Sequence, residues 1–205
     1  ITAVTGAPTQ LRIDVASTLV NNTVFGTQPV VTLLDASGVV VSVGSYSSQR
    51  VTLSSPDSNI SGTLFMNANN GVADFVGNGI KLEGLIGSRS LVATISSPNT
   101  VTATAAVTIT YGAAYKLAIT QQAAGAVNGV AFTTQPKVTV QDISGNTVDN
   151  ATDPIGVASS GATLSGTTPV PAANGTATFS GLKLTGTAAT YTLTFTSGSL
   201  ASDLQ

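Results

Sequence analysis

The chain contains no cysteine, no histidine and no tryptophan, and only 8% of its residues are charged. Without cysteine there are no disulfides, thiolate nucleophiles or cysteine-bound zinc, and without histidine there is no Ser-His-Asp or Cys-His catalysis. Seven Lys and Arg residues against nine Asp and Glu residues leave no basic surface for nucleic acid. We therefore expect neither an enzyme nor a nucleic-acid-binding protein, and no cofactor.

Long apolar runs are also missing. No segment approaches the roughly 18 apolar residues of a membrane-spanning helix, and no signal-peptide pattern opens the chain. We expect no membrane span, and the start at Ile1 rather than Met suggests a processed or excised polypeptide. The abundant residues are Thr, Ser, Val, Ala and Gly, a composition typical of β-proteins with polar, uncharged faces.

The chain contains an internal repeat. Residues 27–38 (TQPVVTLLDASG) return as residues 134–145 (TQPKVTVQDISG), and residues 70–75 (NGVADF) return as residues 174–179 (NGTATF). The offset drifts from about 106 to about 100 along the chain, as differences in loop length would produce. The repeat predicts two domains, residues 7–112 and 113–205, with residues 1–6 as a separate N-terminal strand.

Alternation of apolar and polar residues predicts strands throughout, and no stretch has helical spacing. The expected fold class is all-β, two tandem β-sandwiches, each about a hundred residues long. The side chains expected to face inward lie two apart: Leu11 and Ile13, Val31 and Leu33, Ala73 and Phe75, and Leu91, Ala93 and Ile95 in the first copy, and Leu117 and Ile119, Val138 and Val140, Ala177 and Phe179, and Tyr191, Leu193 and Phe195 in the second.

Four motifs carry a family resemblance that covers essentially the whole chain. The second copy is the closer match, and the first departs from it with Asp74 in place of Thr and with the insertion Gly77-Asn78-Gly79. In the second copy the motifs are Thr-Gln-Pro-x-Val-x-Val-x-Asp-x-x-Gly from Thr134, Leu-Ser-Gly-Thr from Leu164, Asn-Gly-x-Ala-x-Phe-Ser-Gly-Leu from Asn174, and Tyr-x-Leu-x-Phe-x-Ser-Gly from Tyr191. The chain resembles the bacterial immunoglobulin-like repeats of long surface proteins and adhesins. The resemblance implies an Ig-like Greek-key sandwich, an extracellular or cell-surface setting and no catalytic residue.

The two ends of the chain look complementary. Residues 101–111 form a closing strand for the first copy, whereas the second copy stops about halfway through the equivalent strand, so it lacks part of it. Residues 1–7 align with residues 107–113. With Leu200 aligned on Val101, Gln205 falls on Ala106 and Ile1 on Val107, leaving no gap and an inward set of Leu200, Ser202, Leu204, Ile1, Ala3 and Thr5.

A sandwich without half of its last strand exposes an edge that an extended segment can fill. We expect a donor strand with Ile1, Ala3 and Thr5 facing inward. The expected acceptor groove consists of Tyr191, Leu193, Phe195, Leu200 and Leu204. Because the donor and acceptor surfaces differ, such contacts are head-to-tail and produce an open filament of identical copies.

Two histories fit this pattern equally well. In one, each chain is a separate subunit whose N-terminal strand enters its neighbour. In the other, Gln205 is covalently followed by another copy, and the chain is one unit of a long tandem array. The leading hypothesis for function is thus a structural repeat unit of an extracellular filament or fibre. The alternative is a ligand-binding adhesin fragment that uses residues 42–61 or 146–160.

Other candidate sites are weak. Asn-x-Ser/Thr sequons occur at Asn21, Asn59, Asn150 and Asn174, no more often than chance gives, and glycans are possible partners there. The first three are expected in loops, and Asn174 in a hairpin turn. Asp149 and Asp153 form a small acidic cluster, but calcium needs six to eight oxygen ligands, so we expect turn-forming aspartates and no metal. Asp35 and Asp142 are expected to end a strand and begin a turn.

Overall fold

The computed structural model describes residues 6–205, and every regular element in that range is a β-strand. The chain divides into two compact units, Ile1–Thr110 (unit 1) and Tyr111–Gln205 (unit 2). The all-β prediction is therefore confirmed, and the stacked sheets fit a β-sandwich. Within the described residues there is no helix that could cross a membrane.

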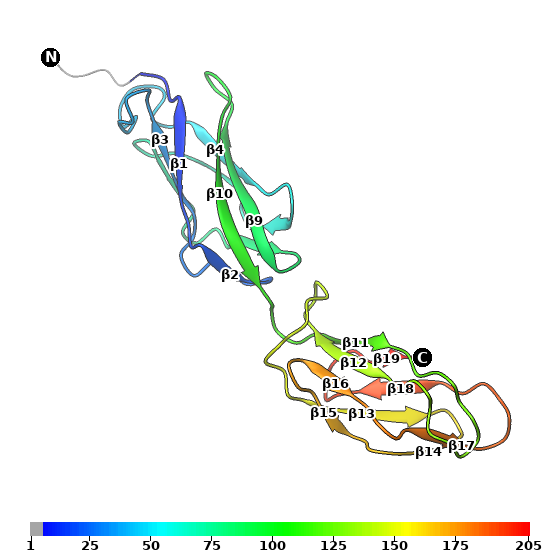
Figure 1. Cartoon of the computed structure of the whole chain (residues 1–205). Helices are drawn as coiled ribbons and strands as arrows, with labels where there is room; N and C mark the ends of the chain where they lie inside the picture. Colours follow the sequence, from blue (N-terminus) through cyan, green and yellow to red (C-terminus); the bar gives the residue numbers. More distant parts are fainter. Residues whose placement is uncertain (1–5) are drawn as a thin grey trace. The chain divides into compact units, whose positions relative to one another are not determined.

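Unit 1 has two main sheets, one in the order β1-β3-β7 and one in the order β2-β10-β9-β4-β6, with a small β5-β8 pair at the side. In Figure 1, β1 and β3 lie to the left of the layer that contains β10, β9 and β4. The strands are β1 (Gln10–Asp14), β2 (Thr18–Val20), β3 (Val30–Leu34), β4 (Arg50–Ser54), β5 (Asn59–Ser61), β6 (Phe65–Asn67), β7 (Val72–Asp74), β8 (Lys81–Glu83), β9 (Gly87–Ile95) and β10 (Val101–Thr110).

Unit 2 repeats this plan, but it has no strand in the place of β2 and its last two strands are much shorter than β9 and β10. Its sheets have the orders β11-β12-β16 and β15-β13-β18-β19, with a β14-β17 pair at the side. The strands are β11 (Lys116–Gln121), β12 (Lys137–Gln141), β13 (Pro154–Ser159), β14 (Thr163–Ser165), β15 (Val170–Pro171), β16 (Thr176–Thr178), β17 (Lys183–Thr185), β18 (Leu193–Thr196) and β19 (Asp203–Leu204).

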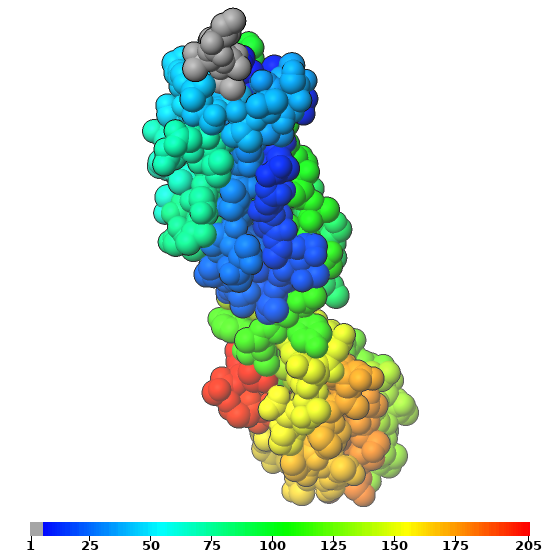
Figure 2. Space-filling model, turned by 90° about the vertical axis from the view of Figure 1, so that its left-hand side faces the viewer, coloured from blue at the N-terminus to red at the C-terminus, as the bar shows by residue number. Residues whose placement is uncertain are grey.

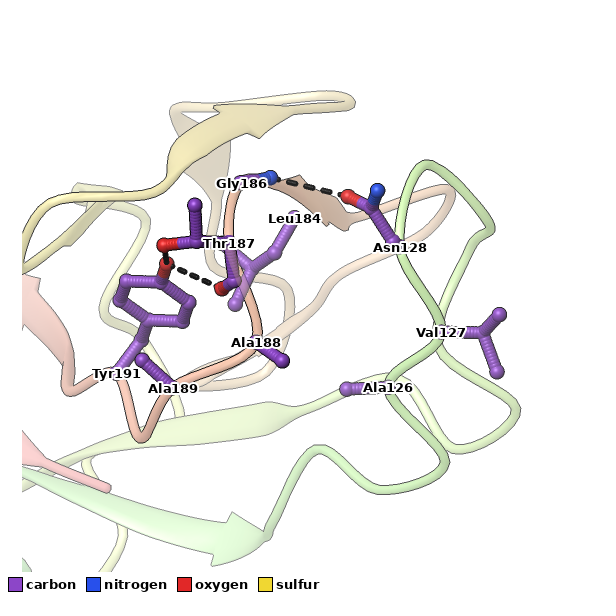
Figure 3. Close-up of a pocket in the computed structure, with 9 residues that line it drawn as sticks. All are labelled: Ala126, Val127, Asn128, Leu184, Gly186, Thr187, Ala188, Ala189 and Tyr191. Carbon is purple, nitrogen blue, oxygen red and sulfur yellow. Dashed lines mark hydrogen bonds between the residues drawn. The ribbon is translucent and has the colours of Figure 1, made fainter.

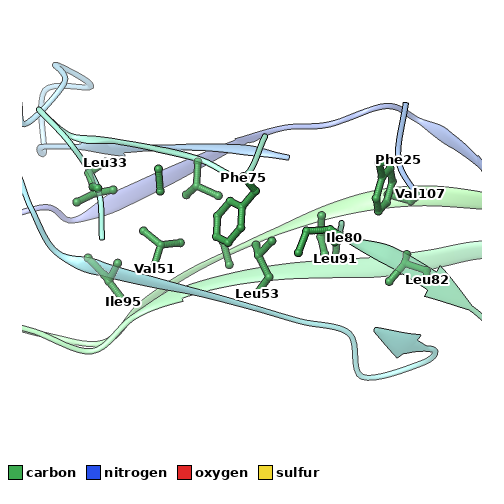
Figure 4. Packing of buried hydrophobic residues seen from close by; sticks show 14 of the residues in the cluster. Phe25, Leu33, Val51, Leu53, Phe75, Ile80, Leu82, Leu91, Ile95 and Val107 are labelled. Atoms are coloured by element: carbon green, nitrogen blue, oxygen red, sulfur yellow. The ribbon is translucent and has the colours of Figure 1, made fainter. Parts of the chain in front are cut away.

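Each unit has its own hydrophobic core between its sheets. The predicted inward phase is right for most strands, since the side chains of Val31, Phe75 and Leu91 in unit 1 are fully buried. Figure 4 shows this core, with Phe25, Val107, Ile80, Leu91 and Leu82 at one end of the cluster. In unit 2, Phe179 and Phe195 pack edge to face with ring centroids 5.4 Å apart. Burial of these alternating side chains is what holds the two layers together.

Tight turns are repeated in both units. Asn70 and Gly71, and likewise Asn174 and Gly175, have positive φ at both positions, as a two-residue type I′ hairpin requires. The predicted aspartate turns are also present. Asp35 Oδ1 accepts hydrogen bonds from the backbone N–H groups of Ser37 and Val39, and Asp142 Oδ1 accepts equivalent bonds in unit 2.

Candidate strand-acceptor groove

Polar side chains that bond to the backbone give the residue-by-residue match between the units. Gln28 Oε1 accepts a hydrogen bond from the N–H of Ile80, and its Nε2 donates to the carbonyl of Phe25. In unit 2, Gln135 makes the same two bonds with Leu182 and Phe132. Asn21 Oδ1 accepts from the N–H of Gly84, as Asn128 Oδ1 accepts from Gly186. These bonds equate Phe25 with Phe132, Asn21 with Asn128 and Gly84 with Gly186.

In unit 1 the closing strand β10 completes the core. It pairs antiparallel with β9 along nine residues and, at its end, parallel with β2. Val107 and Ile109, which face inward from this last part of β10, have exposed fractions of 0% and 1%. The second half of β10 is therefore inserted between two backbone edges, and its two large side chains fill the core between them.

In unit 2 the corresponding strand is much shorter. β19 pairs with β18 through Phe195 opposite Asp203, and Leu193 and Gln205 then exchange two backbone hydrogen bonds of 2.8 and 2.9 Å. On its other side, β9 pairs with β4 in the way that β18 pairs with β13, and this match equates Ala93 with Phe195. Ala103, which lies opposite Ala93, therefore corresponds to Asp203, which lies opposite Phe195. Gln205 therefore corresponds to Ala105, and residues equivalent to 106–110 of unit 1 are not supplied by β19.

Two adjoining hollows lie where those residues would be. The larger, about 400 Å³, and the smaller, about 300 Å³, share Ala126, Leu184 and Tyr191 in their walls. We call the two together the acceptor groove. Figure 3 shows the larger hollow between the loop that carries Gly186 and Tyr191 and the segment that carries Ala126 and Asn128. In Figure 2 the C-terminal residues are red at the surface of unit 2.

The groove coincides with the site that β10 fills in unit 1. The smaller hollow is lined by Phe132, Leu184 and Leu193, which match the residues Phe25, Leu82 and Leu91 around Val107. The larger hollow is lined by Gly186. In unit 1, Ile109 Cδ1 lies 3.9 Å from the place that a Cβ would take on the matching Gly84.

If unit 2 lacks this part of the closing strand, the residues that the strand covers in unit 1 should be more exposed in unit 2, and they are. Leu82 is 0% exposed, whereas its counterpart Leu184 is only partly buried. Leu19 and Asn21 are 5% and 2% exposed. Their counterparts in unit 2, Ala126 and Asn128, are exposed. The same structural positions are thus covered in unit 1 and open in unit 2.

The loop at the open edge is held in the shape that the filled unit has. Tyr191 donates a 2.6 Å hydrogen bond from its hydroxyl to the carbonyl of Thr187, as Figure 3 shows. At the matching position in unit 1, the Arg89 guanidinium donates a 2.8 Å bond to the carbonyl of Leu85. Different side chains thus fix the same turn in the two units, although residues 187–192 belong to no strand.

The structure brings only part of the predicted acceptor set into the groove. Tyr191 and Leu193 line it. Phe195 is fully buried in the core of unit 2, and Leu200 packs against that core. Leu204 was expected to face inward, and this is wrong, since its exposed fraction is 62%.

The inward residues of the last strand are polar instead. Asp203 Oδ2 accepts a 2.7 Å hydrogen bond from the N–H of Ile119, and Gln205 Oε1 accepts one of 2.7 Å from Ala123. The gapless alignment of Gln205 on Ala106 is therefore one residue out. The expected donor residues Ile1, Ala3 and Thr5 lie outside the described residues.

Several groove residues were missed from the sequence, namely Phe132, Leu184, Ala126 and Gly186. The signal that could have found them is the repeat itself, because the same offsets align Phe132 with Phe25 and Leu184 with Leu82. The predicted groove contained residues of the strand next to the open edge and of the last strand, and none from the opposite wall.

The structure changes the list of glycosylation candidates. Asn21 is 2% exposed and its side chain bonds to the backbone of Gly84, so it has no room for a glycan and that candidate is wrong. Asn59 is exposed but opens strand β5 rather than lying in a loop. Asn150 and Asn174 are exposed in turns.

The acidic residues do not form a metal site. Among residues 6–205, no group of three or more His, Cys, Asp or Glu side chains is placed to hold a metal ion. Asp149 and Asp153 are exposed. The nearby Asp142 is buried, and its Oδ2 accepts hydrogen bonds from Gly112 N–H and Asn146 Nδ2, so its carboxylate serves the turn.

Comparison with known proteins adds little. No family model matches the chain, and the curated proteins give no match. Similar solved structures include β-glucuronidase 3 of Bacteroides uniformis (12% identity, TM-score 0.35, 96% of this chain) and a β-glycosidase of Bacteroides vulgatus (14%, 0.36, 98%). The chain spans about a quarter of the length of these enzymes, 24% in both cases. Likeness at this level carries no conclusion about function.

Proposed function

We propose that this protein is a structural subunit of an extracellular filament or cell-surface fibre. Its units are Ig-like Greek-key sandwiches, and copies join head to tail when the N-terminal strand of one copy enters unit 2 of the next. One observation carries this proposal. In unit 1 the side chains of Val107 and Ile109 fill a site in the core, and in unit 2 the equivalent site, with matching walls, is an open groove.

The shape of the groove favours an extended peptide over a compact ligand. Its two walls are backbone segments, residues 187–192 on one side and residues 125–127 on the other, and their counterparts in unit 1 both pair with β10. Main-chain hydrogen bonds supply affinity in strand addition, and alternate side chains in pockets supply specificity. The two hollows provide such pockets two residues apart.

Residues 1–5 are the best-matched occupant in the chain. The offset of 106 that aligns Leu11 with Leu117 also aligns Ile1 with Val107 and Ala3 with Ile109. The segment is therefore the sequence counterpart of the strand that fills the same site in unit 1. Burying an isoleucine side chain contributes roughly 1.5–3 kcal/mol, and each backbone bond adds about 0.5–1.5 kcal/mol.

The joint is directional, which sets the form of the assembly. The donor precedes unit 1 and the groove belongs to unit 2, so donor and acceptor surfaces are different and both remain available after one contact has formed. Heterologous contacts that do not close into a ring produce open fibres. A chain with few charged residues and no cysteine suits a structural role outside the cell.

Removing the donor tests the proposal. The chain that lacks residues 1–5 keeps both described units and should remain monomeric, whereas the whole chain should form fibres that electron microscopy and sedimentation detect. Ile1→Asp should also prevent assembly, because a carboxylate buried in the smaller hollow has no partner. Thr2→Ser is the matched control. Equal assembly of all four proteins would refute the donor role.

A further inference from the structure

We infer that the donor strand binds in one register, with Ile1 in the smaller hollow and Ala3 in the larger, leaving a one-residue space after Gln205. This inference rests on the proposed function and specifies its joint. Ile1 takes the place of Val107, and Ala3 takes the place of Ile109. The space arises because Gln205 matches Ala105, not Ala106.

Pairing with the open edge follows from that register. Val107 lies opposite Arg89 and Thr108 opposite Ser88 in unit 1. The matching pairs across the joint are Ile1 opposite Tyr191 and Thr2 opposite Thr190. On the other wall, Thr108 pairs with Thr18 and Ile109 with Leu19 in unit 1, so Ala3 is placed beside Ala126.

The competing register has no space after Gln205. It would follow if the next copy were joined directly by a peptide bond, so that Ile1 sits opposite Thr192. Because side chains alternate across a strand, Ile1 and Ala3 would then point outward, and Thr2 and Val4 would enter the hollows. That exchange puts isoleucine in solvent and buries a threonine hydroxyl in a hollow walled by Phe132 and Leu184, so it is unfavourable.

The absence of cysteine makes disulfide trapping decisive. Leu193 and Gln205 form a hydrogen-bonded pair, and such pairs alternate with non-hydrogen-bonded ones along an antiparallel edge. The positions opposite Thr192 and Thr190 are therefore non-hydrogen-bonded. Cα atoms there lie about 4.5 Å apart, and a disulfide fits. Thr2→Cys with Thr190→Cys reports the inferred register. Ile1→Cys with Thr192→Cys occupies a non-hydrogen-bonded pair in the gapless register and is the matched competitor.

Both double variants are made in the whole chain, oxidised by glutathione and separated without reductant. We expect a ladder at multiples of 20.3 kDa for Thr2→Cys/Thr190→Cys, with about tenfold or more product than the competitor gives. A stronger ladder from Ile1→Cys/Thr192→Cys would overturn the register and leave the proposed function standing. No ladder from either pair, in proteins that melt as the parent does, would overturn both.

Discussion

At the residue scale, backbone geometry and a few polar side chains fix the turns that both units share. Gly175 has φ of +70°, and a Cβ there would lie 2.5 Å from the carbonyl oxygen of Val148. In unit 1, a Cβ on Gly71 would lie 2.6 Å from the carbonyl oxygen of Val41. The Asn-Gly pairs of the repeat are therefore required by two effects together, a left-handed backbone and a close approach of another chain segment.

A comparison of Gly175→Ala with Gly181→Ala separates the two effects. Gly181 has a similar φ of +66°, but a Cβ there would meet nothing within 4 Å. We expect Gly181→Ala to lower the free energy of unfolding by about 1–2 kcal/mol, the cost of the left-handed conformation. Gly175→Ala should cost at least about 1 kcal/mol more, because the Val148 carbonyl must move. Equal losses in urea unfolding would contradict this account.

Asp57 gives unit 1 an acid-sensitive contact. Both of its carboxylate oxygens accept the N–H of Ser90, at 3.0 and 3.1 Å, and this bonding holds the pKa of Asp57 below its ordinary value of 3.8. A carboxyl with a lowered pKa in the folded state stabilises the fold above pH 3.8, and that stabilisation is lost as the pH falls through the lower, folded pKa.

We expect Asp57→Asn to reduce the stability of unit 1 at neutral pH by up to about 1 kcal/mol, since the site is solvent-exposed. The difference from the parent should shrink in thermal melts as the pH falls below 3.8 and vanish once the pH lies below the lowered pKa of the folded state. Asp149→Asn, which removes a charge from an exposed turn of unit 2, is the control. A difference that stays constant from pH 7 to pH 2 would show that the carboxylate charge plays no part.

At the element scale, the repeat predicted most strands and their inward faces, since Val31, Leu33, Val138 and Val140 all follow the expected alternation and are fully buried. The phase predicted for the last strand is wrong at Leu204, which is 62% exposed, although Leu200 just before the strand does pack against the core. The inward positions of the strand are polar because the backbone of β11 and the segment after it needs hydrogen-bond partners, which Asp203 and Gln205 supply. Sequence alternation reports apolar burial and does not report this need.

The opposite wall of the groove could not be read from strand patterns either. Residues 125–127 form no strand in unit 2, and Ala126 stands where unit 1 has the buried Leu19. Pattern recognition depends on alternating apolar side chains, and this segment presents a glycine, an alanine and an exposed valine.

The substitution Ile109→Ala should test how much the packing of β10 contributes to the stability of unit 1. The side chain is 1% exposed, and its loss leaves a cavity beside Gly84. We expect the free energy of unfolding of unit 1 to fall by about 2–5 kcal/mol, while the outward-facing Thr108→Ala changes it by less than about 0.5 kcal/mol. Similar losses for the two variants in urea unfolding would contradict the packing described for β10.

The substitution Ala126→Trp should block the groove without disturbing the core. Ala126 is exposed and lines both hollows, so an indole there occupies the space of the donor strand. We expect assembly, measured by sedimentation, to fall at least about tenfold with an unchanged melting temperature of unit 2. Ala158→Trp, on the exposed face of β13, is the matched control. Normal assembly of Ala126→Trp would place the joint elsewhere.

At the scale of the whole molecule, the two units differ mainly in how their last strand is completed. Unit 1 supplies its own, from Val101 to Thr110, and unit 2 is completed in this account by another copy. The repeat and the all-β class followed from the sequence. The inferred register did not, because it depends on one backbone pairing, Leu193 with Gln205, that only the structure shows.

The most direct test of strand complementation is amide hydrogen exchange in the chain that lacks residues 1–5, with and without a synthetic peptide of residues 1–6. The account predicts that the peptide slows exchange in residues 187–192 and 125–127, the two walls of the groove, and leaves unit 1 unchanged. A peptide in which Ile1 is replaced by aspartate should have no effect. Exchange in both walls that stays the same at saturating concentrations of the unmodified peptide would contradict the central claim.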